Sequence, residues 1–305
     1  KEVMQFCERE GRVPKCVNKK ASEQTKEEKE ENSLYRKWSR TEEKKKIKLI
    51  ASDLDGTLLQ HSARNCNEEL FPIIEQLCEK GVYFIPASGR QYPCMQNMFA
   101  PVKDKIMYLC ENGALVMHSD KVLVKKQFED TLALKICHAV LDEPDCEVLI
   151  SGEQTSYMIP KTDAFLTYIR DDLENHVSVI EQPEQIKEPI LKIAYFVTEE
   201  RRDEVTAAFS KKFGDKSLIM TSGNRWVDFA PLGTNKGTAL QAIGERLHIS
   251  PDEMVAFGDN ENDRAMLTYV GHPYLMENCN PTMRDIKAVN CKKVEDSLKE
   301  ILEKL

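Results

Sequence analysis

The feature that most restricts the fold of this chain is an apolar strand that ends in two carboxylates. Residues 47–52 form a short apolar run typical of a strand buried in a parallel sheet, and the sequence DLDGTL follows at residues 53–58. Open α/β sheets bind their ligands in the crevice at the carboxyl ends of the strands. Because two acids so close together repel each other unless a cation or a proton joins them, the stretch predicts a charged site at the edge of a parallel sheet.

The segments around this motif alternate between strands and helices. Strands are predicted near residues 82–87, 106–110 and 254–257, and helices near residues 68–79, 91–99, 236–247 and 261–267. A short strand is predicted near residues 269–270, and an amphipathic helix over residues 294–305. Strands that alternate with helices in this way imply a parallel sheet.

The middle of the chain has a different pattern. Helices are predicted near residues 129–141, 163–170 and 199–213, and strands near residues 147–150, 156–159, 191–197, 217–220 and 226–229. Paired strands with helices between them fit an α+β insert better than a continued parallel sheet. The predicted fold class is α/β, with a Rossmann-like doubly wound parallel sheet core and an inserted α+β cap domain.

Composition argues against several classes of function. The chain has 305 residues, of which 41% are apolar, and a net charge of −8. Residues 1–46 carry 14 Lys and Arg against 10 Asp and Glu, so the rest of the chain is acidic, which argues against a nucleic-acid-binding face. No apolar run in the sequence is long enough to cross a bilayer. The ten cysteines form no C-x-x-C pair or zinc spacing, so we expect free thiols in a reducing cytoplasm.

Residues 1–45 are expected to form a disordered or peripheral helical extension. The segment is rich in charges of both signs and poor in apolar residues, so it cannot bury enough surface to offset the entropy that ordering would cost.

Three further motifs stand at predicted strand ends or helix starts. The sequence SGR at residues 88–90 closes the second strand, where a hydroxyl and free backbone N–H groups can hold an anion. Lys236, in the sequence TNKG at residues 234–237, opens a helix where the helix dipole disfavours a cation, which indicates a nearby anion. The sequence GDNEND at residues 258–263 places acids after the last strong strand. The chain therefore carries an acid pair, a hydroxyl, a lysine and an acid cluster, in this order, along one predicted sheet.

In this order the motifs resemble the haloacid dehalogenase (HAD) superfamily, in the branch of Cof-type or IIB hydrolases. The resemblance covers roughly residues 46–305 and includes the sequence ENGA at residues 111–114. It implies a core formed by residues 46–117 and 232–305 and a C2B-type cap formed by residues 118–231, with residues 1–45 outside the family pattern. It also implies a Mg²⁺-dependent phosphatase that hydrolyses a small phosphate monoester, such as a sugar phosphate, through an aspartyl-phosphate.

The resemblance gives each motif residue a role. Asp53 would be the nucleophile and Asp55 the general acid and base, a role for which an ordinary aspartic acid is too strong an acid. Asp53, the backbone carbonyl of Asp55 and Asp259 would hold Mg²⁺. The phosphate group would be bound by Ser88, Lys236, Gly56, Thr57 and Asn262, with support from Asp263, Arg90, Asn112 and Gly89. Arg90 could equally be a structural salt-bridge partner.

The cap would act as a lid that excludes water and contacts the leaving group of the substrate. The candidates for that contact are Lys161, Arg170, Lys192 and Arg225, among which the sequence gives no order. We expect a small phosphorylated metabolite as the partner, no nucleic acid and no membrane, and a monomer or weak homodimer.

Two alternatives stay open. The first is a phosphosugar mutase, which shares this core and cap type and needs a second phosphate site in the cap. The only adjacent arginines of the cap, Arg201 and Arg202, open a predicted helix and do not indicate such a site. The second is a non-catalytic binding protein that uses the tail for its partners.

Overall fold

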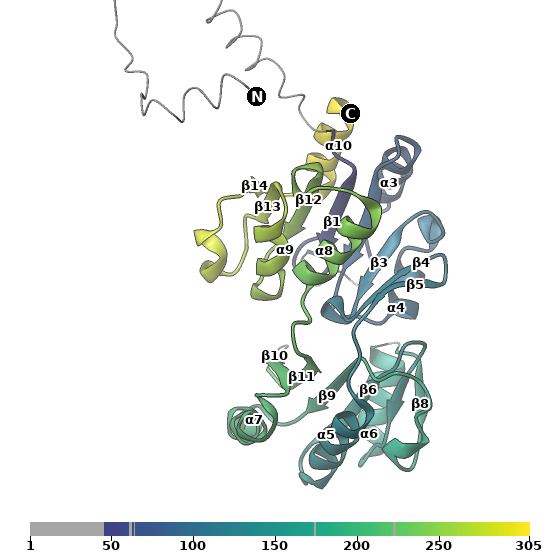
Figure 1. Cartoon of the computed structure of the whole chain (residues 1–305), viewed down its shortest axis with the longest axis vertical. Coiled ribbons are helices and arrows are strands. Elements are labelled where there is room, and N and C mark those ends of the chain that lie inside the picture. Colours follow the sequence, from purple (N-terminus) through teal and green to yellow (C-terminus); the bar gives the residue numbers. More distant parts are fainter. Residues whose placement is uncertain (1–45, 61–62, 64, 174, 222–223) are drawn as a thin grey trace, which may run out of the picture. The chain divides into compact units, whose positions relative to one another are not determined.

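The computed structural model describes residues 46–60, 63, 65–173, 175–221 and 224–305 of the chain (Figure 1). The expectation for residues 1–45 lies outside these ranges. The described part contains one sheet of eight strands and one of six. Within it we find no helix with the length and apolar character that a bilayer crossing requires.

The eight-stranded sheet is built around β1 (Leu49–Asp53), the strand that precedes the acidic motif. Its order is β14-β13-β12-β1-β2-β3-β4-β5, and neighbouring strands from β14 to β3 run parallel. The chain moves from β1 toward β5 on one side and returns at β12 on the other, so the strand order reverses between β1 and β12. Doubly wound sheets bind ligands at such a switch point. The remaining strands are β2 (Tyr83–Ala87), β3 (Met107–Cys110), β4 (Leu115–His118), β5 (Lys121–Lys125), β12 (Met254–Gly258), β13 (His272–Met276) and β14 (Val289–Cys291).

Helices cover both faces of this sheet. The first face carries α3 (Leu70–Glu79), α4 (Tyr92–Met98) and α10 (Val294–Lys304), and the second carries α8 (Lys236–Leu247) and α9 (Arg264–Tyr269). Residues of β1 alternate between the two cores, because Ile50 belongs to the first and Leu49 and Ala51 belong to the second. Burying one large apolar side chain stabilises the folded state by about 1.5–3 kcal/mol. A strand that is apolar on both faces is therefore stable between two helical layers. The predicted doubly wound α/β core is confirmed.

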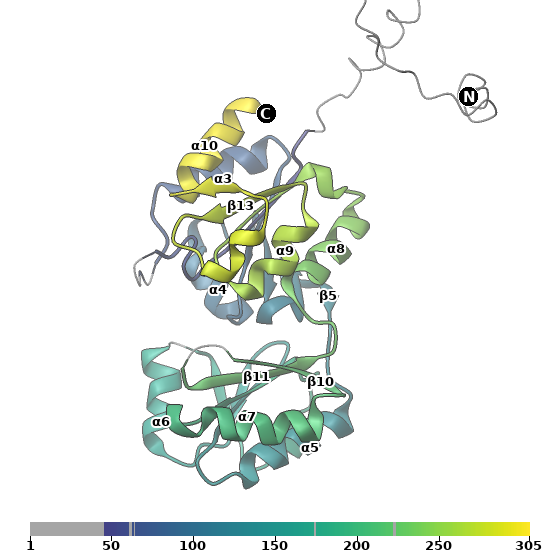
Figure 2. The same cartoon turned by 90° about the vertical axis from the view of Figure 1, so that its left-hand side faces the viewer.

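The six-stranded sheet is mostly antiparallel, with the order β10-β11-β9-β6-β7-β8. Its strands are β6 (Glu147–Ser151), β7 (Ser156–Met158), β8 (Val177–Val179), β9 (Lys192–Phe196), β10 (Ser217–Thr221) and β11 (Trp226–Pro231). The helices α5 (Asp130–Asp142) and α7 (Glu199–Phe213) pack on one side of the sheet (Figure 2). The short helix α6 (Asp163–Thr167) packs on the other side and covers only part of it. This sheet and its helices form the α+β insert that the sequence predicts.

The sequence places the start of the cap at residue 118, but the first sheet continues beyond that point. The strand β5 pairs with β4 and extends the eight-stranded sheet to Lys125. Ser119 and Asp120, which join the two strands, both have positive φ angles, 48° and 59°. A two-residue hairpin turn requires this conformation, and it is usually marked by asparagine or glycine. The hairpin of β4 and β5 could therefore not be predicted from the sequence.

The prediction of a short strand near residues 269–270 is wrong. Tyr269 is the last residue of α9, and β13 begins at His272. β13 contains Pro273, which cannot donate to the sheet, and proline is normally evidence against a strand that has neighbours on both sides. The structure nevertheless pairs β13 with both β12 and β14.

Candidate active site

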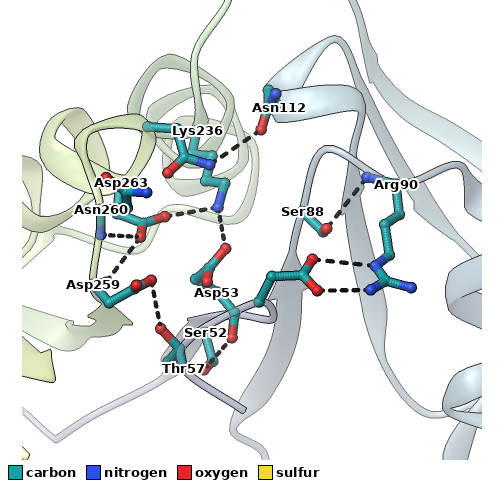
Figure 3. A network of polar contacts seen from close by, with 12 residues as sticks. Ser52, Asp53, Thr57, Ser88, Arg90, Asn112, Lys236, Asp259, Asn260 and Asp263 are labelled. Atoms are coloured by element: carbon teal, nitrogen blue, oxygen red, sulfur yellow. Dashed lines mark hydrogen bonds and ion pairs between the residues drawn. The ribbon is translucent and has the colours of Figure 1, made fainter. Parts of the chain in front are cut away.

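Three charged side chains meet where β1 and β12 end (Figure 3). Asp53 is the last residue of β1, Lys236 is the first residue of α8, and Asp263 ends the 3₁₀ turn that follows β12. Lys236 Nζ donates a hydrogen bond to Asp263 Oδ1 at 2.7 Å and another to Asp53 Oδ1. Lys236 and Asp263 are fully buried and Asp53 is nearly so. The two carboxylates explain how a lysine is stable at the start of a helix.

This cluster carries more negative than positive charge. Burial raises the pKa of Asp53 well above its usual value, and Asp263 raises it further, against the opposing effect of Lys236. Burial alone would lower the pKa of Lys236, but Asp263 and Asp53 raise it above its usual value, so Lys236 stays a cation. One lysine then faces three aspartates when the neighbouring Asp259 is included. A further cation is therefore favourable at this position.

The three aspartates form a group that fits a divalent cation. Asp53, Asp259 and Asp263 each offer a carboxylate oxygen, and these oxygens lie within 4.8 Å of one another. Burial and then Asp263 raise the pKa of Asp259 to about 6. Asp53 Oδ2 is buried and has no hydrogen-bond partner among the described residues. A free oxygen beside other carboxylate oxygens is the donor set that a hard ion such as Mg²⁺ prefers.

Asp263 differs from the other two aspartates because both of its oxygens are already engaged. Oδ1 accepts the hydrogen bond from Lys236, and Oδ2 accepts backbone N–H groups of Asp259 at 3.0 Å and Asn260 at 3.1 Å. These bonds fix the loop that carries Asp259. Asp263 therefore positions Asp259 and Lys236, and the buried oxygen without a hydrogen-bond partner among the described residues belongs to Asp53.

The turn after β1 brings Gly56 and Thr57 against Asp259. Gly56 has a φ angle of 95°, and a Cβ atom added there would lie 2.3 Å from Asp259 Oδ2, so only glycine fits. The Thr57 hydroxyl donates to Asp259 Oδ1 at 3.3 Å. The backbone N–H groups of Gly56 and Thr57 donate to the carbonyls of Leu59 and Leu54 within the turn. In the structure both residues thus shape the turn and hold Asp259.

Ser88 and Asn112 lie in two loops that are joined by backbone hydrogen bonds. Ser88 follows β2, is 2% exposed, and its Oγ accepts the N–H of Arg90 at 3.2 Å. The N–H of Asn112 donates to the carbonyl of Ser88 at 2.9 Å, and Asn262 Nδ2 lies 3.5 Å from Asn112 Oδ1. A Cβ atom at Gly89 would lie 3.0 Å from Asn112 Nδ2, so the glycine permits the close approach of the two loops.

Asp55 and Arg90 form an ion pair at the rim of the site. The Arg90 guanidinium donates to both carboxylate oxygens of Asp55, at 2.6 Å and 3.2 Å. The side chain of Asp55 is 60% exposed, in contrast to the buried Asp53 two residues earlier. Arg90 is thus a salt-bridge partner in this structure, the alternative that the sequence left open for it.

A cavity of about 450 Å³ connects this site with the six-stranded sheet. From the first sheet it is lined by residues that include Asp55, Ser88, Arg90, Asn112 and Asn262. From the second it is lined by Leu149, Ser151, Lys192, Ala194, Trp226 and Asp228. The residues at the two sheets are distant in the sequence and line one cavity.

The four basic residues that the sequence offers as contacts for the leaving group lie in different places in the structure. Lys192 lines this cavity, whereas Lys161 and Arg225 line a different one of about 770 Å³ beside α6. Arg170 is exposed and forms an ion pair with the adjacent Asp171.

Sequence reasoning missed the acidic and hydroxyl residues that stand near Lys192. Asp228 and Ser151 were not among the predicted site residues, and Glu111 entered only as part of the ENGA motif. The available signal was a buried polar residue within an apolar strand, as in the sequences EVLIS and WVDFAP at residues 147–151 and 226–231.

Comparison with known proteins identifies the family. The family model described as haloacid dehalogenase-like hydrolase matches residues 50–298. The chain belongs to this family. The predicted resemblance to HAD hydrolases is confirmed.

Individual relatives agree with this assignment. The 5-amino-6-(5-phospho-D-ribitylamino)uracil phosphatase YbjI of Escherichia coli is 25% identical over 232 residues, which cover 76% of this chain and 86% of that protein. A solved structure from Eubacterium rectale is 27% identical with a TM-score of 0.77 and covers 83% of this chain and 98% of its own. BT4131, described as a HAD subclass IIB sugar phosphatase, has the same fold, with a TM-score of 0.69 at 19% identity over 83% of this chain and 98% of its own.

Proposed function

We propose that this HAD hydrolase is a Mg²⁺-dependent phosphatase that removes phosphate from a small phosphate monoester through an aspartyl-phosphate on Asp53. The observation that carries the proposal is the buried Asp53 at the switch point of the sheet. It is held by Lys236, and one of its oxygens has no hydrogen-bond partner in the described part of the chain. The name of the relative YbjI, a phosphatase, supports the same reaction class.

The proposed reaction proceeds in two displacement steps at phosphorus. In the first, a carboxylate oxygen of Asp53 bonds to phosphorus while the bond between phosphorus and the leaving oxygen breaks. Asp55 gives its proton to the leaving oxygen, which requires that it first separate from Arg90. In the second, water attacks phosphorus, Asp55 takes its proton, and Asp53 is released as the carboxylate.

Other side chains stabilise charge during these steps. Lys236 Nζ contacts Asp53 directly and is positioned by Asp263, so it can neutralise charge at the attacking group. The Ser88 hydroxyl lines the cavity and can donate to a phosphoryl oxygen. Asn112 and Asn262 stand beside Ser88 and restrict the position of the phosphoryl group.

The donor set at this site fits Mg²⁺. Asp53, Asp259 and the backbone carbonyl of Asp55 would hold the ion, and Asp263 would keep Asp259 in place. When bound, the ion neutralises charge on the phosphoryl group and so lets a carboxylate approach a dianion.

The test is phosphate release from a panel of phosphorylated metabolites with and without Mg²⁺. We expect release that needs Mg²⁺ and that falls by about 10³-fold or more in Asp53→Asn, because the nucleophile is lost. Asp215→Asn, which changes an exposed aspartate of the insert, is the matched control and should keep full activity.

Two results would contradict the proposal. The first is Asp53→Asn with the activity of the wild type, which would favour another nucleophile. The second is conversion of a sugar phosphate to its isomer without net phosphate release, which would favour a mutase.

A further inference from the structure

We propose that the cavity of about 770 Å³ beside α6 is a second binding site, which takes a planar aromatic molecule that carries a negative group. The ring would stack on Trp226, and the negative group would contact Arg225 and Lys161. We call this space the aromatic cavity. The inference goes beyond the proposed phosphatase function and does not depend on it.

The aromatic cavity lies at the other end of the strands from the candidate active site. Lys192, which lines the cavity of the active site, is the first residue of β9, and Phe196, which lines the aromatic cavity, is the last. At about 3.3 Å per residue these two positions are about 13 Å apart. Among the described residues, Trp226 alone lines both cavities. A ligand of the aromatic cavity is therefore held by a set of residues of its own.

Four aromatic rings line the aromatic cavity. The ring centres of Phe196 and Trp226 are 5.0 Å apart, and those of Phe165 and Phe196 are 5.4 Å apart with 30° between the ring planes. Phe165 is buried, whereas Tyr168, Phe196 and Trp226 each keep part of their surface accessible. Accessible ring faces in a cavity offer a stacking surface for another planar ring. Sites for small molecules are typically apolar and aromatic in this way, with a few polar groups that fix the orientation of the ligand.

Two cations line the same cavity and form no ion pair within the described part of the chain. Arg225 Nε donates to the carbonyl of Val197 at 3.3 Å, and Lys161 Nζ donates to the carbonyl of Glu143 at 2.6 Å. The Arg225 guanidinium also lies 4.0 Å from the centre of the Phe196 ring, so the ring orients it. Its two terminal nitrogens are the ones that can donate to a ligand, and a guanidinium binds a carboxylate or phosphate in two-point geometry.

The acids that line the aromatic cavity have other partners. The two oxygens of Glu147 accept the backbone N–H of Lys161 at 2.8 Å and the hydroxyl of Thr162 at 2.7 Å. Asp145 pairs with Arg201 at 2.5 Å. An anionic group can therefore reach Arg225 without displacing a carboxylate from it. Together the rings and the cations favour a ligand that is aromatic at one end and negative at the other.

The first experiment measures binding to the full chain by isothermal titration calorimetry. The probe is 2-naphthoate, and it is compared with 2-naphthamide, which lacks the charge, and with cyclohexanecarboxylate, which lacks the aromatic ring. We expect 2-naphthoate to bind and both analogues to bind at least about 10-fold more weakly, because each lacks one of the two recognised features.

Substitutions test the cations. Arg225→Gln should weaken the binding of 2-naphthoate by about 10- to 100-fold, the effect of losing a hydrogen bond to a charged group. Lys161→Gln should act in the same direction with a smaller loss. Arg246→Gln, which makes the same change at an exposed arginine of α8, is the control and should bind as the wild type does. Thermal melting reports whether each variant is folded.

A second experiment locates the bound probe. The chain has two tryptophans, Trp38 and Trp226, so the protein labelled with 5-fluorotryptophan gives two fluorine NMR signals, and Trp38→Phe assigns them. We expect 2-naphthoate to shift the signal of Trp226. Inorganic phosphate with Mg²⁺ should not displace the probe, because it would occupy the other cavity.

Several results would overturn the aromatic cavity as a binding site. They are the absence of binding at millimolar 2-naphthoate, equal binding of either analogue, wild-type binding by folded Arg225→Gln, an unshifted Trp226 signal, and displacement of the probe by phosphate. Asp53→Asn should bind 2-naphthoate as the wild type does, so a failure of the proposed phosphatase function and a failure of this inference give different results.

Discussion

Two lysines, Lys236 at the start of α8 and Lys192 at the start of β9, each stand between two carboxylates, and they differ in how closely the carboxylates approach them. Lys236 lies 2.7 Å from Asp263 and contacts Asp53 directly. Lys192 lies 2.6 Å from Glu111 but 4.0 Å from Asp228. Both carboxylates thus lie within hydrogen-bond distance of Lys236, whereas only Glu111 lies within that distance of Lys192. The comparison teaches that the side chains of the proposed active site are held in place by the protein itself, whereas Asp228 is held less closely.

The difference has a structural cause. Lys236 and both of its partners stand at strand ends and helix starts of the eight-stranded sheet, where backbone hydrogen bonds fix their positions. Lys192 takes its partners from two places, because Glu111 follows β3 of the first sheet and Asp228 belongs to β11 of the second. The contacts of Lys192 therefore depend on how one sheet is placed against the other, whereas those of Lys236 depend on the eight-stranded sheet alone.

The largest expected effect is on stability. Lys236→Met leaves Asp53 and Asp263 buried without their cation, so we expect the free energy of unfolding to fall by about 3–5 kcal/mol. Lys192→Met leaves Glu111 beside a cavity that water can enter, and we expect a loss of about 1–3 kcal/mol. Urea denaturation followed by circular dichroism measures both.

The control for this pair is Lys216→Met, which removes an exposed lysine of the insert and should change the free energy of unfolding by less than about 0.5 kcal/mol. Equal losses in Lys236→Met and Lys192→Met would show that the two arrangements are equally tight and would break the comparison.

The second effect is stabilisation by the metal ion. Mg²⁺ at 100 times its Kd should raise the free energy of unfolding by about 2.7 kcal/mol, measured as a shift of the melting temperature. Asp259→Asn should abolish the shift, because it removes a charged donor from the cluster around Asp53. Asp228→Asn, the same substitution in the other sheet, should keep it. A shift that survives in Asp259→Asn would place the ion elsewhere.

The smallest effect is expected at a partly exposed ion pair, which serves as the lower reference for Lys236 and Lys192. Lys48 Nζ lies 2.7 Å from Glu253, and the hydrogen bonds from Lys48 and Ser250 lower the pKa of Glu253 to about 2. A carboxylate with a lowered pKa stabilises the fold at neutral pH, and this contribution is lost as the pH falls from about 4.5 toward 2.

Glu253→Gln should therefore lower the melting temperature slightly at pH 7 and by progressively less below pH 4.5, as a series of thermal melts across this range would measure. A difference between wild type and variant that grows on acidification would contradict the assignment.

Much of the fold could be predicted because its signals are local. The apolar run before Asp53 and the helix that starts at Lys236 can both be read from a few neighbouring residues, and the structure has β1 and α8 at those places. The predictions failed where the signal was not local. The hairpin of β4 and β5 depends on positive φ angles at Ser119 and Asp120. In β13, Pro273 pairs with β12 alone, because the pairing with β14 begins at Tyr274.

The residues of the candidate site show the same difference between local and non-local signals. The motif residues Asp53, Lys236, Asp259 and Asp263 lie together in the structure, as expected from their places at strand ends and helix starts. Ser151, Lys192 and Asp228 lie on three strands that are separated in the sequence by about forty residues each, and no local pattern distinguished Lys192 from the other basic candidates.

The sequence by itself determined the strand and helix periods, the order of the motifs and the family, because each of these depends on residues that are neighbours along the chain. Only the tertiary structure decided which polar side chains of the insert line the cavity at the candidate active site. That outcome depends on strand register, which is set by the packing of whole sheets against their helices and is not encoded in any short segment.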